Sequence, residues 1–395
     1  MPKLTIEQLD LAGQRVFIRA DFNVPLTGGE VADDTRLRAV VPTIQYALKA
    51  GAAVVLASHL GRPQGKVARE YSLRPVVDRL EALLGQRVEL VPDCVGPETL
   101  ARVRSLKPGE TLLLENLRFH PEEEANDDGF ARELAALADC YVDDAFAAAH
   151  RTHASIVAIT RYVQPAAAGL LMQQELSALG RILQSPERPL VAILGGAKVS
   201  DKLALVEHLL GRVDALLVGG GMAFTFLLAL GHAVGRSLVE ADCVETARAA
   251  LNAARRRGVR LVVPLDTVVA ASVDSASGRA VGIREIPPDQ MGLDIGPRTC
   301  ETFAAMMRTA QTVVWNGPMG VFEKTPFAAG TLGVARAVAE APAFSVVGGG
   351  DTIAALAEAG VIERIGYVST AGGAFLEFLE GRRLPGVEAL TEAPV

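Results

Sequence analysis

Residues 190–202, LVAILGGAKVSDK, contain the pattern that decides the fold: a short apolar run, then glycines, then the start of a helix. The pattern returns at 216–224, LLVGGGMAF, and glycines also follow the apolar runs at 313–315, 345–347 and 366–368. Apolar runs of this kind are typical of parallel strands that are covered on both faces. Ligands bind at the carboxyl ends of such strands, so these glycines predict a binding site.

The first half of the chain has the same alternation of strands and helices, but its strand ends are charged. We expect strands at 16–19, 54–57, 112–114 and 141–142, with amphipathic helical segments between them. The segments that follow these strands read ADFNVP, SHLGRP, ENLRFH and DDAFAAAHRTHAS. The chain is therefore predicted to be an α/β protein with two doubly wound parallel-sheet domains. If each half carries one ligand, the domains must close to bring the ligands together, so we also expect a hinge-bending cleft.

The domain boundaries are predicted from a segment in the middle of the chain. Residues 161–189 lack a clear strand and contain one helical stretch, which the sequence SPERP ends. We expect an N-terminal domain at 1–165, a linker helix at 166–188 and a C-terminal domain at 189–370. The last segment, 371–395, is expected to return towards the first domain.

The composition excludes several classes of partner. Lys and Arg number 39 against 46 Asp and Glu, which gives a net charge of −7 and no general attraction to nucleic acid or an acidic membrane. The four cysteines form no CxxC pair, so we expect reduced thiols and a cytoplasmic protein. The apolar stretch 215–231 is interrupted by glycines, and we expect a buried strand and helix there, with no membrane span.

The charged strand ends of the first half predict a site for a small, highly charged anion. His59, Arg62, Arg118 and Arg151 all lie in these segments. Guanidinium groups bind phosphate and carboxylate oxygens in a bidentate manner, so convergence of these residues would form one anion site. The two histidines of HRTH lack a third ligand nearby, so a zinc site is the weaker interpretation.

The glycine-rich strand ends of the second half predict a nucleotide site. Glycine lets the backbone approach a phosphate, and the N–H groups of the following helix attract negative charge. Lys198 and Lys202 are four residues apart, so we expect them on one helical face, pointing at the same phosphates. Asp351 follows Gly348–Gly350 and is expected to cap a helix or to meet a magnesium ion.

Several of these residues have an equally simple structural interpretation. GGAK is neither a Walker A loop nor a dinucleotide-binding motif, and a lone run of glycines is usually a turn. Asp21 and Asn23 are as consistent with a turn before Pro25 as with a ligand role. Taken locally, Arg36 is an exposed residue near a helix start, and Glu122–Glu124 form a solvated acidic face.

The order of these segments along the chain identifies a family. RADFNVP, SHLGRP, LENLRFH, AHRTHAS, GGAKVSDKL, GGGMAFTFL, VVWNGPMGVFE and GGGDT follow one another, and the whole sequence resembles the phosphoglycerate kinases. The resemblance implies reversible phosphoryl transfer from 1,3-bisphosphoglycerate to Mg-ADP, giving 3-phosphoglycerate and ATP, a reaction of glycolysis. It implies a monomer that transfers the group directly, in line, after domain closure, with Mg²⁺ as the cofactor.

The resemblance also implies the site residues. The substrate-binding residues are Asp21, Asn23, Arg36, His59, Arg62, Arg118 and Arg151. The nucleotide-binding residues are Lys198, Lys202, Gly292, Glu323, Gly349, Gly350, Asp351 and Thr352. Arg36, Lys198 and Lys202 are implied to be catalytic, and Asp351 is implied to hold magnesium through the nucleotide.

Three positions depart from the family pattern, and one alternative function stays open. Asp143, Ala147 and Ala371 stand where the family has Asn in NDAFG, Gly in the same motif and the first Gly of STGGG. These changes leave every implied phosphate ligand intact but affect local turns. The alternative is a noncatalytic nucleotide-binding relative, which would be expected to lose charged groups such as Arg36 and Lys198.

Overall fold

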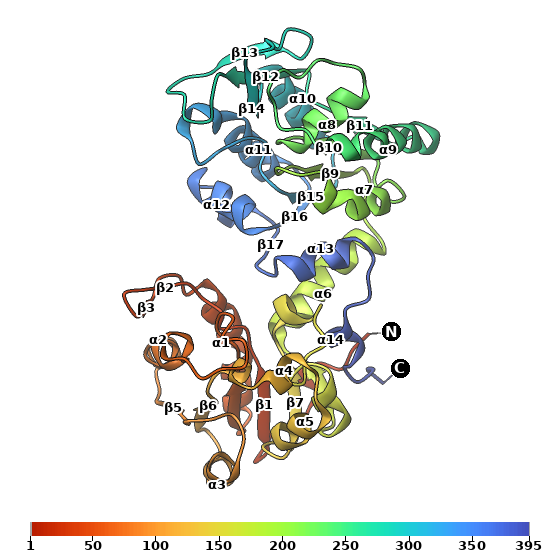
Figure 1. Cartoon of the computed structure of the whole chain (residues 1–395). Coiled ribbons are helices and arrows are strands. Elements are labelled where there is room, and N and C mark those ends of the chain that lie inside the picture. Colours follow the sequence, from red (N-terminus) through yellow and green to blue (C-terminus); the bar gives the residue numbers. More distant parts are fainter. Residues whose placement is uncertain (1, 395) are drawn as a thin grey trace. The chain divides into compact units, whose positions relative to one another are not determined.

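The computed structural model describes residues 2–394, which form two compact units, each built around a six-stranded parallel sheet (Figure 1). The first unit contains the chain up to Ser177 together with the residues from Arg383 onwards, and the second contains Ala178–Arg382. The predicted class, an α/β protein with two doubly wound parallel sheets, is confirmed.

In the first unit the central strands are the most apolar and carry the site residues at their carboxyl ends. The sheet order is β5 (Val88–Leu90), β6 (Thr111–Leu113), β4 (Ala53–Ala57), β1 (Arg15–Arg19), β7 (Cys140–Asp143) and β8 (Ala166–Ala168). A two-stranded ribbon consists of β2 (Leu26–Thr27) and β3 (Glu30–Val31). The helices are α1 (Thr35–Lys49), α2 (Arg74–Leu84), α3 (Pro97–Arg104), α4 (Pro121–Glu124), α5 (Asp128–Ala135) and α14 (Pro385–Glu388).

The second unit combines its parallel sheet with a small antiparallel one. The large sheet has the order β11 (Arg260–Val262), β10 (Ala215–Val218), β9 (Leu190–Leu194), β15 (Thr312–Asn316), β16 (Phe344–Gly348) and β17 (Tyr367–Ser369). The small sheet has the order β13 (Arg279–Gly282), β12 (Asp266–Ala270) and β14 (Met291–Ile295). The helices are α7 (Leu203–Leu209), α8 (Met222–Ala229), α9 (Val244–Arg257), α10 (Pro297–Met307), α11 (Ala329–Glu340), α12 (Gly350–Glu358) and α13 (Gly373–Leu379).

The expected linker differs from the structure in one element. Residues 161–189 were expected to lack a strand, but Ala166–Ala168 forms the edge strand β8 and pairs with Tyr141–Asp143. Three alanines carry no strand pattern, so only the tertiary pairing makes this segment a strand. The predicted helix is present as α6 (Leu170–Leu183), and the boundary between the units falls within it, after Ser177.

The end of the second unit also differs from the expected boundary at 370. The chain stays in that unit through α13, and only the residues from Arg383 onwards belong to the first unit. Phe375 explains the difference, because its buried ring packs directly against Gly348 at the end of β16. An apolar helix that fills the space beside a strand end remains with that sheet.

The expectations about cysteines and about residues 215–231 can be compared directly with the structure. Cys94, Cys140, Cys243 and Cys300 are free thiols. Residues 215–231 form the buried strand β10, a glycine turn and the buried helix α8, as predicted. Within residues 2–394 no helix has the length and apolar character needed to cross a membrane.

Candidate active site

The first candidate site begins where β1 leads into the loop before α1. Arg36, in the first turn of α1, donates from Nη1 to Asp21 Oδ2 at 2.8 Å and to the Asn23 carbonyl oxygen at 3.1 Å. Asn23 Oδ1 accepts a hydrogen bond from the Gly61 N–H at 2.8 Å, which ties this loop to the one after β4. The structure thus brings Asp21, Asn23 and Arg36 together, and the Arg36 side chain stays 34% exposed, accessible to a ligand.

Arg118 extends this group from the short helix after β6. Its Nη1 donates to the Gly61 carbonyl oxygen at 2.8 Å, while its Nη2 is buried and has no hydrogen-bond partner among residues 2–394. The side chain is only 4% exposed, and this burial lowers the pKa of Arg118 to about 10. A buried guanidinium with an unused donor is a built position for an anionic oxygen, because such donors are rarely left unpaired.

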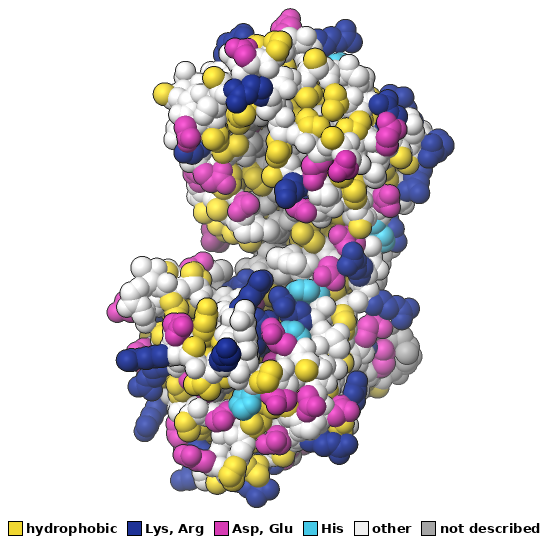
Figure 2. Space-filling view, in the orientation of Figure 1, with side chains coloured by type: hydrophobic (Ala, Val, Ile, Leu, Met, Phe, Trp, Pro, Cys, Tyr) yellow, Lys and Arg dark blue, Asp and Glu magenta, His cyan; other side chains and the backbone are white. Residues whose placement is uncertain are grey.

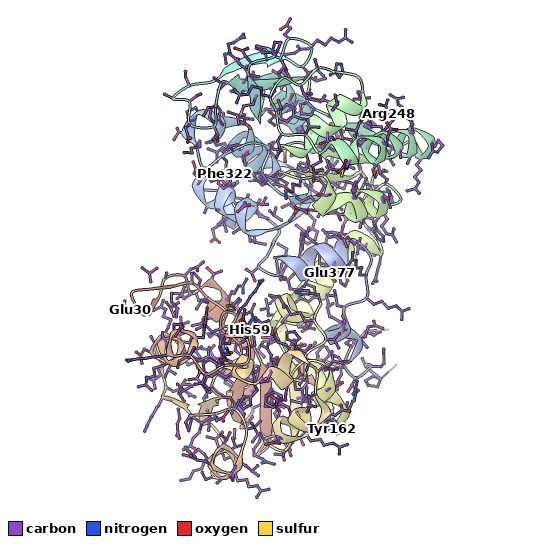
Figure 3. The ribbon with its side chains drawn as sticks, in the orientation of Figure 1. Glu30, His59, Tyr162, Arg248, Phe322 and Glu377 are labelled. Carbon is purple, nitrogen blue, oxygen red and sulfur yellow. The ribbon has the colours of Figure 1, made fainter. Side chains whose placement is uncertain are left out.

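His59 and Arg151 lie within electrostatic range of Arg118, and Arg62 lies in the loop after β4. Burial, and then the charges of Arg19, Arg118 and Arg151, hold the pKa of His59 well below its ordinary value. Arg151 is half-buried, and Arg62 is exposed without a hydrogen bond or ion pair in the described part of the chain. Figure 2 shows Lys, Arg and His side chains gathered on the first unit, and Figure 3 shows His59 among nitrogen-bearing side chains.

The interpretation of Glu122–Glu124 as a solvated acidic face is wrong for its middle residue. Glu123 is completely buried and accepts hydrogen bonds from the Ser155 N–H at 2.9 Å and from Ser155 Oγ at 2.6 Å. Ser155 in turn accepts a hydrogen bond from Arg19, a fully buried residue that the sequence indicated only as the end of a strand. The sequence of three glutamates does not indicate which side chain is buried. Glu123 is buried because it bonds Ser155, which lies 32 residues further along the chain.

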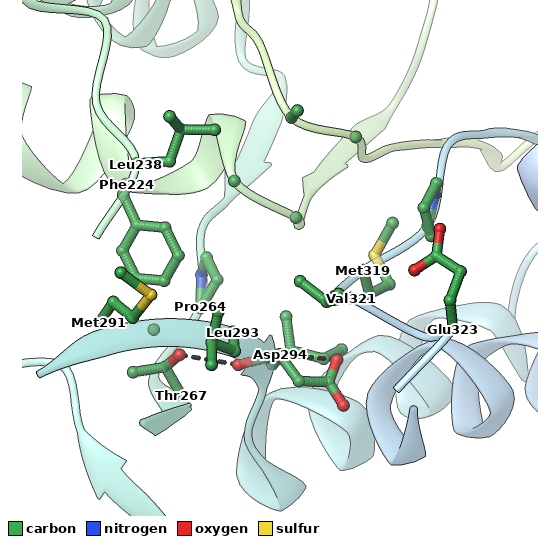
Figure 4. A pocket seen from close by; sticks show the side chains of 18 of the residues that line it. Phe224, Leu238, Pro264, Thr267, Met291, Leu293, Asp294, Met319, Val321 and Glu323 are labelled. Carbon is green, nitrogen blue, oxygen red and sulfur yellow. Dashed lines mark hydrogen bonds between the residues drawn. The ribbon is translucent and has the colours of Figure 1, made fainter. Parts of the chain in front are cut away.

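The second candidate site is a pocket of 440 Å³ in the second unit (Figure 4). Among the predicted residues, Gly292, Glu323 and Asp351 line this pocket, together with the glycine backbone at the ends of β9 and β10. Its apolar walls were not predicted; they include Phe224, Leu238, Pro264, Met291 and Val321. Met291 belongs to the small antiparallel sheet, which has no regular signal in the sequence. Mostly apolar walls with a few polar groups are typical of small-molecule pockets.

Two positions in this pocket require glycine for different reasons. A Cβ at Gly292 would lie 2.1 Å from Phe224 Cζ, so the ring occupies the space that a side chain would need. Gly220 has φ +66° and would place a Cβ 2.6 Å from the backbone of Gly196. Gly220 therefore lets the segments after β9 and β10 approach each other, and Gly292 lets the start of β14 approach α8.

The two lysines do not share a helical face, and that expectation is wrong. Lys198 is exposed and precedes the short helix Ser200–Lys202, while α7 begins only at Leu203. Lys202 turns inwards, where its Nζ donates to the Gly195 carbonyl at 2.6 Å and to the Asn316 carbonyl at 3.0 Å. Burial lowers the pKa of Lys202 to about 8. Lys202 therefore bonds the strand ends directly below the glycine-rich loops.

The last group of predicted residues, 349–352, lies at the start of α12. Gly349, with φ +99°, is the N-cap residue and Gly350 follows it, so the cap is made by glycine and not by Asp351. Asp351 is exposed in the first turn, at the edge of the pocket, where a carboxylate can serve a divalent cation. Thr352 is buried, and its Oγ1 accepts a hydrogen bond from the Gly317 N–H at 2.7 Å.

A buried guanidinium with an unused donor in one α/β unit and a glycine-lined pocket in the other are features that a two-unit α/β phosphotransferase requires. The family model for phosphoglycerate kinase matches residues 6–382. The chain belongs to the phosphoglycerate kinase family and is a kinase.

Similar proteins cover the whole chain. Phosphoglycerate kinase of Moorella thermoacetica is 56% identical over 393 residues, covering 99% of this chain and 100% of that protein. The same enzyme of Acidobacterium capsulatum is 55% identical, with the same coverage. The solved structure of phosphoglycerate kinase from Coxiella burnetii matches with a TM-score of 0.92 and 43% identity, covering 98% of each chain.

Proposed function

We propose that this kinase transfers the acyl phosphate of 1,3-bisphosphoglycerate directly and in line to Mg-ADP, giving 3-phosphoglycerate and ATP. The observation that carries the proposal is the anion site of the first unit, where Arg36 stays accessible and Arg118 Nη2 is buried and unsatisfied. The two arginines are linked through hydrogen bonds to Asn23 and Gly61. Phosphoryl transfer needs positioning and charge neutralisation more than covalent chemistry, and this site supplies both.

The substrate would be held by the residues of the first unit. Arg62, Arg118, Arg151 and His59 bind its nonreacting phosphate and its carboxylate, while Asp21 and Asn23 bind its hydroxyl. Arg36 neutralises the migrating phosphoryl group. The bond of Arg36 to Asp21 supports this role, because the carboxylate orients the guanidinium before the substrate arrives.

The nucleotide would be held by the second unit. Gly292 and Glu323 line the pocket for its base and sugar, while Gly349, Gly350 and Thr352 shape the loop for its phosphates. Lys198 contacts the migrating group, and Lys202 contacts the nucleotide phosphates. Magnesium, when bound with the nucleotide, neutralises phosphate charge, and the exposed carboxylate of Asp351 fits the oxygen ligands that this cation prefers.

The transfer requires the two ligands to meet. Reacting atoms must come within about 3 to 3.5 Å for in-line displacement, and the substrate and nucleotide residues belong to different units. We therefore propose that the ternary complex closes and excludes water, with no covalent enzyme intermediate. The protein acts as a monomer, and its free thiols agree with a cytoplasmic location.

A coupled assay tests the proposed function. ATP formation from 1,3-bisphosphoglycerate and Mg-ADP is followed with the full chain, and we expect turnover that stops when either substrate is omitted. Nucleotide binding without turnover would instead show the alternative, a noncatalytic nucleotide-binding relative. The retention of Arg36, Lys198, Lys202 and Asp351 argues against that alternative.

A further inference from the structure

We propose that Arg19 is a positioning residue that holds His59 in the tautomer protonated on Nε2, so that His59 acts as a neutral hydrogen-bond donor to 3-phosphoglycerate. The inference rests on the proposed function for its ligand. The tautomer itself is a property of the free protein. Arg19 acts through His59 and is not itself assigned a contact with substrate.

The first step concerns what Arg19 can do. Arginine has five N–H donors and no acceptor. Arg19 Nη2 lies 3.3 Å from His59 Nδ1, and both side chains are buried. His59 Nδ1 must therefore accept, so it carries no proton, and the proton of the neutral ring lies on Nε2.

The second step concerns what holds Arg19 in place. Its Nε donates to Ser155 Oγ at 2.8 Å, and its Nη1 donates to the Ala20 carbonyl. Because Ser155 Oγ accepts from Arg19, its own proton goes to Glu123 Oε1, 2.6 Å away. Glu123 also accepts from the Ser155 N–H at 2.9 Å, so the direction of every bond in the series is set.

The third step concerns charge. His59 faces Arg19, Arg118, Arg151 and His153, and burial with these charges holds the pKa of His59 well below its ordinary value. A second proton on this ring is therefore disfavoured. This agrees with the position of Arg19 Nη2, a donor that faces Nδ1 and leaves no room for a proton there. The remaining nitrogen, Nε2, has no hydrogen-bond partner among residues 2–394 and is left for a ligand.

A neutral donor has a specific use at this site. Several guanidinium groups already supply positive charge, and a charged imidazolium would add repulsion among them. An Nε2–H donor adds direction without charge. It would thus orient one oxygen of the substrate while the arginines neutralise it.

Nitrogen-15 spectroscopy of the histidine-labelled full chain tests the tautomer without any ligand. The His59 signals are identified by their loss in His59→Asn. We expect a neutral ring protonated on Nε2 in the parent at pH 7, and a mixture of tautomers in Arg19→Met. A parent ring protonated on Nδ1 or on both nitrogens, or an unchanged Arg19→Met spectrum, would overturn the proposal.

Ser155→Ala provides a second variant that keeps the proposal testable if Arg19→Met does not fold, because Arg19 is fully buried in β1. Ser155→Ala removes the bond that fixes Arg19 but leaves its charge. We expect a mixed His59 tautomer and a KM for 3-phosphoglycerate raised about tenfold, with the KM for Mg-ATP unchanged. An unchanged tautomer and KM would overturn the positioning role.

Arg15→Met is the matched control. Arg15 lies on the same strand but pairs with Asp139 at the other end, at 2.6 Å. It should leave the His59 spectrum and both KM values as in the parent. A chain with the expected tautomer but without turnover would refute the proposed function alone, whereas turnover with the wrong tautomer would refute only the role of Arg19.

Discussion

Arg19 and Asp143 are direct neighbours in the first sheet, as Cα partners on β1 and β7, and both side chains are fully buried. Burial raises the pKa of Asp143 to about 6, although Arg19 acts to lower it. Its Oδ1 accepts a hydrogen bond from the Ala145 N–H at 2.9 Å, while its Oδ2 is buried without a partner in the described chain. The Asp143 carboxyl group is thus unfavourable when charged.

Asp143→Asn is therefore expected to stabilise the protein at alkaline pH. A folded-state pKa of about 6 lies above the unfolded value of 3.8, so the folded protein loses stability as pH rises from 3.8 through 6. The loss is complete above that range and amounts to roughly 3 kcal/mol. Unfolding in urea should show Asp143→Asn more stable than the parent at pH 8, with only a small part of the difference left at pH 4.

Asp139→Asn is the control for this prediction. Asp139 lies just before the same strand and is bonded to Arg15, which holds the pKa of Asp139 below its ordinary value. Its removal should destabilise the protein at pH 8, with an effect of opposite sign. Equal stability of Asp143→Asn and the parent at both pH values would show that the charged Asp143 carboxylate does not destabilise the folded protein.

Lys202 is expected to take up a proton when nucleotide binds. Its pKa is lowered to about 8 in the free protein, so about half of the side chains are neutral at pH 8. Phosphate oxygens favour the charged form. Calorimetry of Mg-ADP binding at pH 8, in buffers of different ionisation enthalpy, should show uptake of about half a proton.

Two variants assign this proton. Lys202→Met should abolish the uptake, whereas Lys198→Met should retain it, because Lys198 is exposed and no carbonyl of the strand ends holds it. Uptake that persists in Lys202→Met would place the titrating group elsewhere.

Gly292→Ala is expected to weaken nucleotide binding selectively. The new Cβ would meet the Phe224 ring at 2.1 Å, so the ring must shift, and this ring lines the pocket. The Kd of ADP should rise by about tenfold or more, and that of 3-phosphoglycerate should not change. Phe224→Leu in the same chain should restore part of the affinity, and Gly180→Ala, which meets open space, should have no effect. Normal ADP affinity in Gly292→Ala would show that this pocket is not the nucleotide site.

Ligand-driven closure predicts a change in solution scattering. Only the ternary complex gains contacts that both ligands share, so each ligand alone should change the radius of gyration much less than the pair. The pair tested is 3-phosphoglycerate with a nonhydrolysable magnesium nucleotide. An unaltered profile in a saturated ternary complex would rule out closure as the step that joins the sites.

Most strands of the two large sheets could be predicted because their signals are local. The roles of Asp21, Arg118 and Asp351 stay predictions. An apolar run followed by glycine or a basic group indicates a buried strand and its ligand edge without knowledge of the neighbours. Arg19 and Glu123 could not be assigned, because their burial depends on Ser155, which is distant from both in the sequence. The apolar walls of the pocket could not be predicted for the same reason. Phe224 lies on α8 and Met291 on β14, and these two elements are distant in the sequence.

The inward turn of Lys202 was missed for another reason. Four-residue spacing places two side chains on one face only if the helix is already continuous, and here α7 starts after Lys202. Helix boundaries depend on capping and on tertiary contacts, and the bonds of Lys202 to Gly195 and Asn316 are such contacts. The spacing alone could not reveal them.

The rate of ATP formation in Arg36→Ala, compared with Arg38→Ala, tests the central claim most directly. The two arginines are two residues apart, but Arg36 is bonded to Asp21 in the anion site and Arg38 pairs with Asp34 on the surface. If Arg36 neutralises the migrating phosphoryl group, Arg36→Ala should lower kcat by roughly two to four orders of magnitude. Arg38→Ala should turn over at the parent rate. Equal kcat values for Arg36→Ala and the parent would contradict the account.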